Sequence, residues 1–467
     1  MALLPKYVGL RSLADDLYLR FVKEDVQIHG YVKYDSHDVV TPYTKYEVEP
    51  AKVGKRYVNI RCCYSNKYWV RPSMNSRYVV AAADEPNEDE SNWSCTLFEP
   101  IHDSGNQAYR IKHVQLGFNT CSSRDGSIHN ECLFIMTSSA PPRNFGDLHI
   151  VMDWESFFIF PKHVAFKGGN RGKFLKAIWL QRHEYQEFSA NDMADPAVGN
   201  EVSFTRHGDV RIKSNHFGKF WRLSPNWIWA DSTDPTANNK HTLFKPVKVA
   251  NNIVALRNLG NNHFCIGLTT EGKTDCLNAW VSTITNEARM EIHELVLSRS
   301  IYNVDFHLFD ARIYGENIIA MANGNAVNNT NEPNTITIRF SYTNRVTNTW
   351  SSTLSAKLGV KATFRAGIPV IAQGRVTISA EFSGEYTWGE TRETTDEIET
   401  THTVVVPPMT KMTVSLLATQ GYCDVPFSYY QRDVLMNGET VIELYEDGLY
   451  TGANCYNFKY EAKDEPL

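Results

Sequence analysis

The chain lacks the features that mark several large classes of protein. No stretch comes near the roughly 18 consecutive apolar residues of a transmembrane helix. The nine cysteines are scattered, and the absence of a Cys-x-x-Cys pair argues against a structural zinc site or a thioredoxin-type redox site. We expect reduced, mostly buried thiols. The formal net charge is −6, and no segment has the strong basic excess of a nucleic-acid-binding surface, so nucleic acid is not an expected partner.

Catalytic motifs are missing as well. No His-Glu-x-x-His, Gly-x-Ser-x-Gly or phosphate-binding P-loop pattern occurs. Carboxylates at Glu184, Glu187, Asp192 and Asp195 offer the pairs that a glycosidase uses, but ordinary surface loops carry as many. We therefore expect no enzyme activity, no cofactor and no metal site. The N-terminus has no basic region followed by an apolar stretch, so we expect a cytoplasmic protein that could reach membranes on release by wounding.

A long internal repeat divides the first two thirds of the chain. The segment that begins at Val58 recurs at Val210, with strand-like residues, an Asn/Gly turn, an aromatic pair and Arg-x-Ser-x-Asn in the same order. Each copy continues into Thr-Leu-Phe-x-Pro. This agreement indicates a tandem duplication, with one domain in residues 1–150 and a second in residues 151–297.

A shorter repeat of roughly 45 residues lies inside each copy. Each unit has a strand, a polar turn, an aromatic residue or Leu, and another strand, and apolar residues alternate rather than following a helical period. Three such units of about four short strands predict a β-trefoil. The units begin near Tyr7, Tyr57, Tyr109, Val164, Val210 and Ile253.

Residues 298–467 have a different composition, with Ser- and Thr-rich alternation that predicts a third, all-β domain of long hairpins. The sharpest pattern lies in residues 355–383. Even-numbered positions on both arms are apolar or Gly, and odd-numbered positions are mostly polar. Between the arms, residues 367–372 form an uncharged apolar stretch that we expect to be the turn.

This hairpin fits a membrane-spanning role. Each arm has about eleven residues, and a membrane-spanning strand needs about 9–11. One hairpin cannot span alone, because its backbone groups would be unsatisfied in lipid, so several chains would each contribute one to a closed barrel. The expected lumen residues are Lys357, Lys361, Thr363, Arg365, Gln373, Arg375, Thr377, Ser379 and Glu381. The expected lipid-facing or tip residues are Val360, Phe364, Ile368, Pro369, Val370, Ile371, Val376, Ile378 and Phe382. The alternative is an amphipathic hairpin that packs one face on a soluble core.

The third domain resembles a known family. Residues 350–352, the alternating arms, the Gly-Ile-Pro-Val-Ile tip and residues 386–388 are similar to the stem region of aerolysin-type β-pore-forming proteins. Residues 407–414 resemble that family's return strand. The resemblance covers about residues 300–467 and rests on motifs.

The tandem half resembles the amaranthin-type lectins of plants. The similar segments are residues 46–50, 91–98, 113–117 and 217–224, within a likeness that covers about residues 5–297. The resemblance implies two β-trefoils that bind glycans containing galactose or N-acetylgalactosamine. It also implies a site formed between the first domain of one protomer and the second domain of another.

The repeated Arg-x-Ser-x-Asn-aromatic segment supplies the chemistry of a sugar site. Aromatic faces pack on the apolar side of a sugar ring, and amides or guanidinium groups bind its hydroxyls. The alternative is that the aromatics fill the trefoil cores and the asparagines are turn residues. The candidate carbohydrate-binding residues are Asn75, Arg77 and Tyr78 in the first domain and Asn226, Trp227 and Trp229 in the second.

Together these observations predict an all-β chain of two trefoils and an elongated aerolysin-like domain. The expected function is a glycan-binding lectin that forms homo-oligomers, inserts a β-barrel into a target membrane and acts in plant defence. One alternative is a cytoplasmic lectin whose third domain serves oligomerisation or stress signalling without a pore. Another is a trefoil protease inhibitor, for which the sequence shows no identifiable reactive loop.

Overall fold

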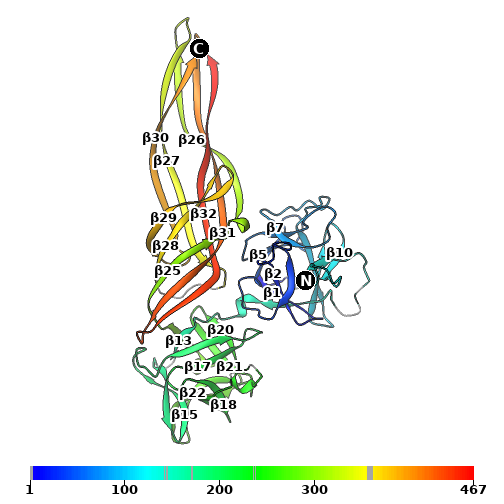
Figure 1. Ribbon diagram of the computed structural model, residues 1–467, viewed down its shortest axis with the longest axis vertical. Coiled ribbons are helices and arrows are strands. Elements are labelled where there is room, and N and C mark those ends of the chain that lie inside the picture. The colour runs from blue at the N-terminus through cyan, green and yellow to red at the C-terminus, as the bar shows by residue number, and fades with distance from the viewer. Residues whose placement is uncertain are drawn as a thin grey trace. The chain divides into compact units, whose positions relative to one another are not determined.

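A computed structural model shows the fold of the chain (Figure 1). It describes residues 4–140, 142, 146–169, 172–234, 236, 238–354 and 361–467. The chain divides into two compact units. One unit holds β1 to β24 and residues Arg432–Glu443. The other comprises Ile301–Ser352, Lys361–Gln431 and Leu444–Leu467. No helix in the described part of the chain is long and apolar enough to cross a bilayer.

The first domain is a closed barrel with three hairpins. Strands β1, β4, β5, β8, β9 and β12 pair in that order, and β12 returns to β1 to close the ring. The pairs β2–β3, β6–β7 and β10–β11 are the additional hairpins. This threefold arrangement is the β-trefoil. Its strands are β1 (Tyr7–Ser12), β2 (Tyr18–Phe21), β3 (Val32–Ser36), β4 (Tyr46–Pro50), β5 (Val58–Cys62), β6 (Tyr68–Val70), β7 (Val80–Ala83), β8 (Leu97–Asp103), β9 (Ala108–His113), β10 (Phe118–Ser122), β11 (Leu133–Ile135) and β12 (His149–Asp153).

The second domain repeats the same topology. Strands β13, β16, β17, β20, β21 and β24 close the ring, and β14–β15, β18–β19 and β22–β23 are the hairpins. Short 3₁₀ turns are η1 (Trp154–Ser156), η2 (Lys240–Thr242) and η3 (Asn286–Ala288). The strands are β13 (His163–Gly168), β14 (Phe174–Leu180), β15 (His183–Ala190), β16 (Asn200–Phe204), β17 (Val210–Ser214), β18 (Lys219–Ser224), β19 (Trp227–Ser232), β20 (Phe244–Ala250), β21 (Ile253–Asn258), β22 (Phe264–Thr270), β23 (Lys273–Val281) and β24 (Met290–Glu294).

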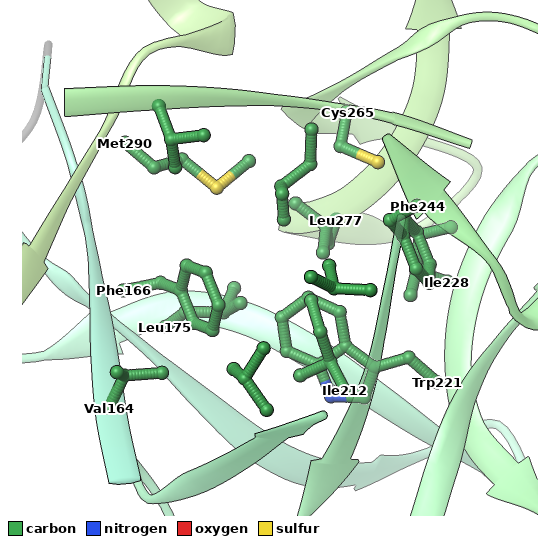
Figure 2. Packing of buried hydrophobic residues seen from close by; sticks show 14 of the residues in the cluster. Val164, Phe166, Leu175, Ile212, Trp221, Ile228, Phe244, Cys265, Leu277 and Met290 are labelled. Carbon is green, nitrogen blue, oxygen red and sulfur yellow. The ribbon is translucent and has the colours of Figure 1, made fainter. Parts of the chain in front are cut away.

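Alternating residues of the ring strands fill each trefoil core. In β4, Tyr46 and Val48 point inward, while Glu47 and Glu49 remain outside, where both pair with Arg61. The second core centres on the fully buried Trp221, beside which Figure 2 shows Phe166 and Ile212. Burying each large apolar side chain contributes about 2–3 kcal/mol, so these cores stabilise both domains.

The third domain is an eight-stranded sheet of long strands, in which β26–β31, β27–β30, β27–β32 and β28–β29 are antiparallel. Its order is β29-β28-β25-β31-β32-β27-β30, and β26 pairs with β31. One short 3₁₀ turn, η4 (Leu308–Asp310), precedes β26. The prediction of an all-β chain with two trefoils and a distinct third domain is confirmed. The strands are β25 (Val296–Phe306), β26 (Arg312–Asn328), β27 (Asn334–Ser352), β28 (Ala362–Ala372), β29 (Arg375–Tyr386), β30 (Thr391–Val406), β31 (Thr410–Leu435) and β32 (Thr440–Pro466).

Candidate functional site

In the second trefoil, the predicted sugar residues make contacts within the protein. Asn226 lies in the turn between β18 and β19, where its carbonyl accepts a hydrogen bond from the Ala279 amide at 2.8 Å. Its side-chain oxygen accepts one from Asn261 at 3.4 Å. The Trp227 side chain is buried, and its indole nitrogen donates to Glu271 at 3.3 Å. These two residues hold the hairpin in place.

Trp229 is half-buried and stacked. Its ring lies parallel to the His183 imidazole, with 3.9 Å between centroids and 9° between planes. The Arg222 guanidinium lies 5.8 Å from the Trp229 ring centre and pairs with Asp231. One face of the Trp229 ring is therefore taken by His183.

In the first trefoil, the three predicted residues have different surroundings. Asn75 is exposed in the loop after β6. Arg77 donates to the carbonyls of Ile135 and Met136, so its guanidinium joins two segments of the domain. Arg77 therefore has a structural contact, whereas the Asn75 amide faces solvent.

Tyr78 belongs to a polar-aromatic cluster. Its hydroxyl donates to Asp125 at 2.6 Å, and its ring stacks on His129 with 4.6 Å between centroids. The hydrogen bond from Tyr78 is the main cause that lowers the pKa of Asp125 to about 2. Asp125 is therefore a carboxylate at neutral pH, and it orients the Tyr78 hydroxyl.

A hollow on the first trefoil is lined by residues other than the predicted sugar residues. Its walls come from the loop after β6, the loop between β7 and β8, and the turn after β9, and they include Met74, Trp93 and Gln115. The sequence signal was partial, because residues 91–98 and 113–117 stood out as lectin-like segments. Nothing in their spacing indicated that the two segments meet.

The stem region is a hairpin of β28 and β29. The expected turn at residues 367–372 is wrong, because these residues continue β28 and pair with β29 up to Ala372–Arg375. The chain reverses at Gln373 and Gly374, with φ of 51° and 72°. Gly adopts this left-handed conformation at little cost, whereas the apolar side chains of Ile368 and Ile371 pack on the domain.

The apolar face of the hairpin packs on the core of the third domain. Ala362, Phe364 and Ala366 are buried on β28, and the Phe364 ring lies 5.1 Å from that of Trp350. A register shift between Gly367 and Pro369 then moves the buried face to odd-numbered residues, including Ile371. The expected even-numbered apolar face is therefore interrupted within β28.

Two side-chain hydrogen bonds hold the end of β28 to β32. The buried Asn454 side chain accepts from the Ile371 amide at 2.8 Å and donates to the Ile371 carbonyl at 2.9 Å. At the other end of the hairpin, the Tyr386 hydroxyl donates to Asn348 at 3.0 Å. The amide of Asn454 thus replaces a strand partner for one residue of the hairpin.

The predicted lumen residues that are described lie on the solvent side. Lys357 and Val360 are outside the described residues, as are the side chains of Glu381 and Phe382. Among the predicted lipid-facing or tip residues, Phe364, Pro369 and Ile371 are buried, Ile368, Val370 and Val376 are half-buried, and Ile378 is exposed. The exposed lumen candidates are Lys361, Thr363, Arg365, Gln373, Arg375, Thr377 and Ser379.

The hairpin is inserted in sequence between two long paired strands. β27 and β30 pair without a register shift from Asn334–Val406 to Thr349–Thr391. Threonine pairs bridge the ladder, with 3.0 Å between the hydroxyls of Thr337 and Thr403. In the described part of the chain, no group of three His, Cys, Asp or Glu side chains is arranged to hold a metal ion.

Family comparisons match both parts of the chain. The Agglutinin domain model matches residues 2–144 and 158–296, which is more than half of the chain. The model described as Clostridium epsilon toxin ETX/Bacillus mosquitocidal toxin MTX2 matches residues 301–432. These matches confirm the resemblance to a lectin joined to a pore-forming toxin domain.

Individual relatives are more distant. Natterin-1 of Thalassophryne nattereri is 33% identical over 79 residues, which cover 17% of this chain and 22% of Natterin-1. A lamprey immune protein is 14% identical with a TM-score of 0.32, covering 66% of this chain and 100% of that chain. An aerolysin-like protein of Bombina maxima is 14% identical with a TM-score of 0.26, covering 36% and 99%. By its matched domains, the chain belongs to the agglutinin-domain family, with two agglutinin domains followed by a toxin domain of the ETX/MTX2 type.

Proposed function

We propose that this protein is a glycan-directed pore-forming lectin. The trefoils bind glycans ending in galactose or N-acetylgalactosamine and concentrate the chain on a target membrane. Protomers then associate through the third domain, and the β28–β29 hairpin leaves its core. Hairpins from several chains close a β-barrel. The proposal assigns binding and insertion, and no catalytic step, to the chain.

One observation carries the pore-forming half of the proposal. The β28–β29 hairpin is amphipathic and lies in sequence between β27 and β30, which already form a long antiparallel ladder. If the hairpin extends away from the domain, the ladder and the hairpin make one continuous pair of strands. A lone pair would leave backbone groups unsatisfied in lipid, which is why the proposal includes a homo-oligomer.

The glycan-binding half rests on the two agglutinin domains. Galactose-type specificity, a role in plant defence, and a cytoplasmic store released on wounding belong to the same proposal. They are supported by the resemblance of the trefoils to amaranthin-type lectins.

The test is dye release from liposomes that carry galactosylated or N-acetylgalactosaminylated lipids. The double variant Ile371→Cys with Asn454→Cys, in a Cys455→Ser background, places a disulfide at the point where β28 contacts β32. We expect release by the Cys455→Ser parent, none by the oxidised double variant, and recovery when the disulfide is reduced. The reduced form of the double variant is the matched control for its oxidised form, because the two differ only in the disulfide.

A lectin without pore activity is the second candidate. It is favoured by the burial of Phe364 and Ile371 in the core of the third domain, as in a permanently packed hairpin. Binding to the liposomes without dye release, by parent and locked variant alike, would support this candidate and contradict insertion. Failure of the parent to bind any of the liposomes would contradict the lectin half.

A further inference from the structure

A hollow of about 540 Å³ opens on the surface of the first trefoil. Three segments that are distant in sequence meet there: the loop after β6, the loop between β7 and β8, and the turn after β9. The lining residues used below are Arg71, Met74, Asp89, Ser91, Trp93 and Gln115.

Arg71 fixes two walls of this hollow. Its side chain is only 4% exposed, and its guanidinium donates to the carbonyl of Trp93 at 3.2 Å and to that of Met74 at 3.1 Å. A buried cation that binds backbone carbonyls of both loops sets the spacing between them. The hollow is therefore held in shape before any ligand arrives.

The walls combine apolar surface with a hydrogen-bonding group that has no partner. The side chains of Trp93 and Met74 are 39% and 65% exposed. The Gln115 side-chain oxygen is buried, and the described residues supply no donor to it. A buried acceptor without a partner is costly. A rotation of the Gln115 side chain that brings this oxygen to the surface of the hollow would let a ligand hydroxyl donate to it and remove that cost.

The loop between β7 and β8, which supplies Trp93, also supplies negative charge. Asp89 Oδ1 accepts hydrogen bonds from the Ser91 amide at 2.9 Å and the Ser91 hydroxyl at 2.6 Å. The Ser91 hydroxyl is the largest cause that lowers the pKa of Asp89 below its ordinary value. Asp89 is thus a fixed carboxylate, suited to accept from hydroxyl groups and unsuited to sit beside an anion.

This set of groups fits a neutral sugar ring. The C–H face of a pyranose packs on an indole, and its hydroxyls supply donors for the Gln115 and Asp89 oxygens. An apolar ligand would leave the Gln115 oxygen unsatisfied, and an acidic sugar would meet the Asp89 carboxylate.

We propose that this hollow, with Trp93 as the stacking platform and Gln115 as the buried acceptor, binds the terminal neutral pyranose of the glycan in the first trefoil. The inference rests on the proposed lectin function and deepens it. It assigns sugar contacts to Trp93, Gln115 and Asp89.

The second trefoil offers an internal comparison. Phe98 pairs with His113 in the first domain, and Phe244 pairs with Asn258 in the second. On this register, Trp93 corresponds to Asn239, which has no aromatic ring. Gln115 corresponds to Gly260, which has no side chain. The pair of a tryptophan and a glutamine is therefore present at these positions in the first domain and absent from them in the second.

The experiment measures binding of the full chain to an array of glycans ending in galactose or N-acetylgalactosamine, each with and without sialic acid. Trp93→Ala and Gln115→Leu change different walls. Trp179→Ala, which removes a tryptophan that is 65% exposed on β14, is the matched control. Thermal unfolding curves identify any variant that is misfolded.

We expect both hollow variants to weaken binding to the neutral glycans at least tenfold and Trp179→Ala to change it less than twofold. Sialylation should weaken wild-type binding. If wild type binds but Trp93→Ala and Gln115→Leu bind equally well, the hollow is not the site and the lectin function stands. If wild type binds sialylated and neutral glycans alike, the assignment of a neutral ligand is wrong. Binding to no glycan by wild type overturns both the site and the lectin function.

Discussion

His113 and His149 are buried in the first trefoil and are held as neutral rings. His113 Nδ1 accepts a hydrogen bond from the Leu116 amide at 3.2 Å, which leaves its Nε2 to donate to the Cys95 carbonyl at 3.3 Å. Burial is the main cause that lowers the pKa of each histidine to about 4. A proton on His113 Nδ1 would face another donor, so protonation and this hydrogen bond exclude each other.

This arrangement predicts that the first trefoil loses stability in acid. Unfolded histidine has a pKa near 6.5, so below that pH the unfolded state binds protons that the folded state refuses. The loss begins below about pH 6.5, grows as the pH falls toward 4, and reaches about 3 kcal/mol for each histidine. Urea unfolding at pH 7 and pH 4.5 measures it.

The exposed His37 supplies the control for this prediction. We expect His113→Gln to make the stability less dependent on pH between 4.5 and 7, and His37→Gln to leave the dependence unchanged. Equal pH dependence in wild type and His113→Gln would show that His113 does not couple folding to protons.

The β28–β29 hairpin depends on a close approach at its register shift. A Cβ atom at Gly367 would lie 2.2 Å from the Ile378 Cγ2 atom and 2.9 Å from the Ser379 carbonyl oxygen. One of these contacts is with backbone, so the packed hairpin cannot accept even Ala at this position without moving. Gly367 is therefore required by the hairpin in its packed form.

We predict that Gly367→Ala destabilises the packed hairpin by about 1–3 kcal/mol, the usual cost of overpacking. Trypsin should then cut faster at Arg365 and Arg375, and dye release from glycolipid liposomes should be faster. Gly105→Ala is a suitable control, because a Cβ there has only one neighbour, at 3.5 Å. Unchanged cleavage in Gly367→Ala would contradict the prediction.

Elements with a clear sequence repeat or alternation could be predicted from the sequence. Contacts between individual residues that are distant in the sequence could not. The duplicated segment at Val58 and Val210 was sufficient for the tandem trefoils, because repetition in sequence imposes repetition in fold. The stem turn was misplaced because an uncharged apolar stretch was expected to be a tip, although Gln373-Gly374 has the residues that a tight turn needs. Ile371 instead packs inside the domain, where Asn454, more than 80 residues later, binds its backbone.

The sugar residues show the same division. The Arg-x-Ser-x-Asn segment contains Arg71 and Met74, two residues that line the proposed hollow, but its own candidate residue Asn75 is not part of the lining. Pattern could not reveal that Trp227 is buried and bonded to Glu271, or that the hollow joins Trp93 to Gln115. Such facts depend on which loops the barrel brings together.

At the scale of the whole molecule, charge is unevenly distributed. Residues 298–467 carry 13 Lys and Arg against 20 Asp and Glu, which gives this segment a formal net charge of −7. The whole chain has a net charge of −6, so the rest of the chain is close to neutral. The toxin-type domain is therefore the acidic part. Bringing several copies together on a membrane sets like charges against one another.

We predict that assembly is faster at higher salt. The Debye length falls from about 30 Å at 0.01 M to about 8 Å at 0.15 M, so salt screens repulsion between the acidic domains. With the amount of bound protein held equal, dye release from neutral glycolipid liposomes should be faster at 0.15 M salt and slower when anionic lipid is added. Release that slows with salt at equal binding would contradict this.

The order of strands in the third domain has a consequence for any assembly built by strand pairing. The main path of the sheet begins with β29 and ends with β30, with β26 branching from β31, and the strands at the two ends of the path differ in length and sequence. A protomer that joins its β29 side to the β30 side of its neighbour makes a head-to-tail contact, which leaves the same two unlike sides free for the next copy. Such heterologous contacts build closed rings when the rotation between neighbours divides a full turn, and open filaments when it does not. The angle between two adjacent sheets, rather than the affinity between them, would then set the number of chains in the ring.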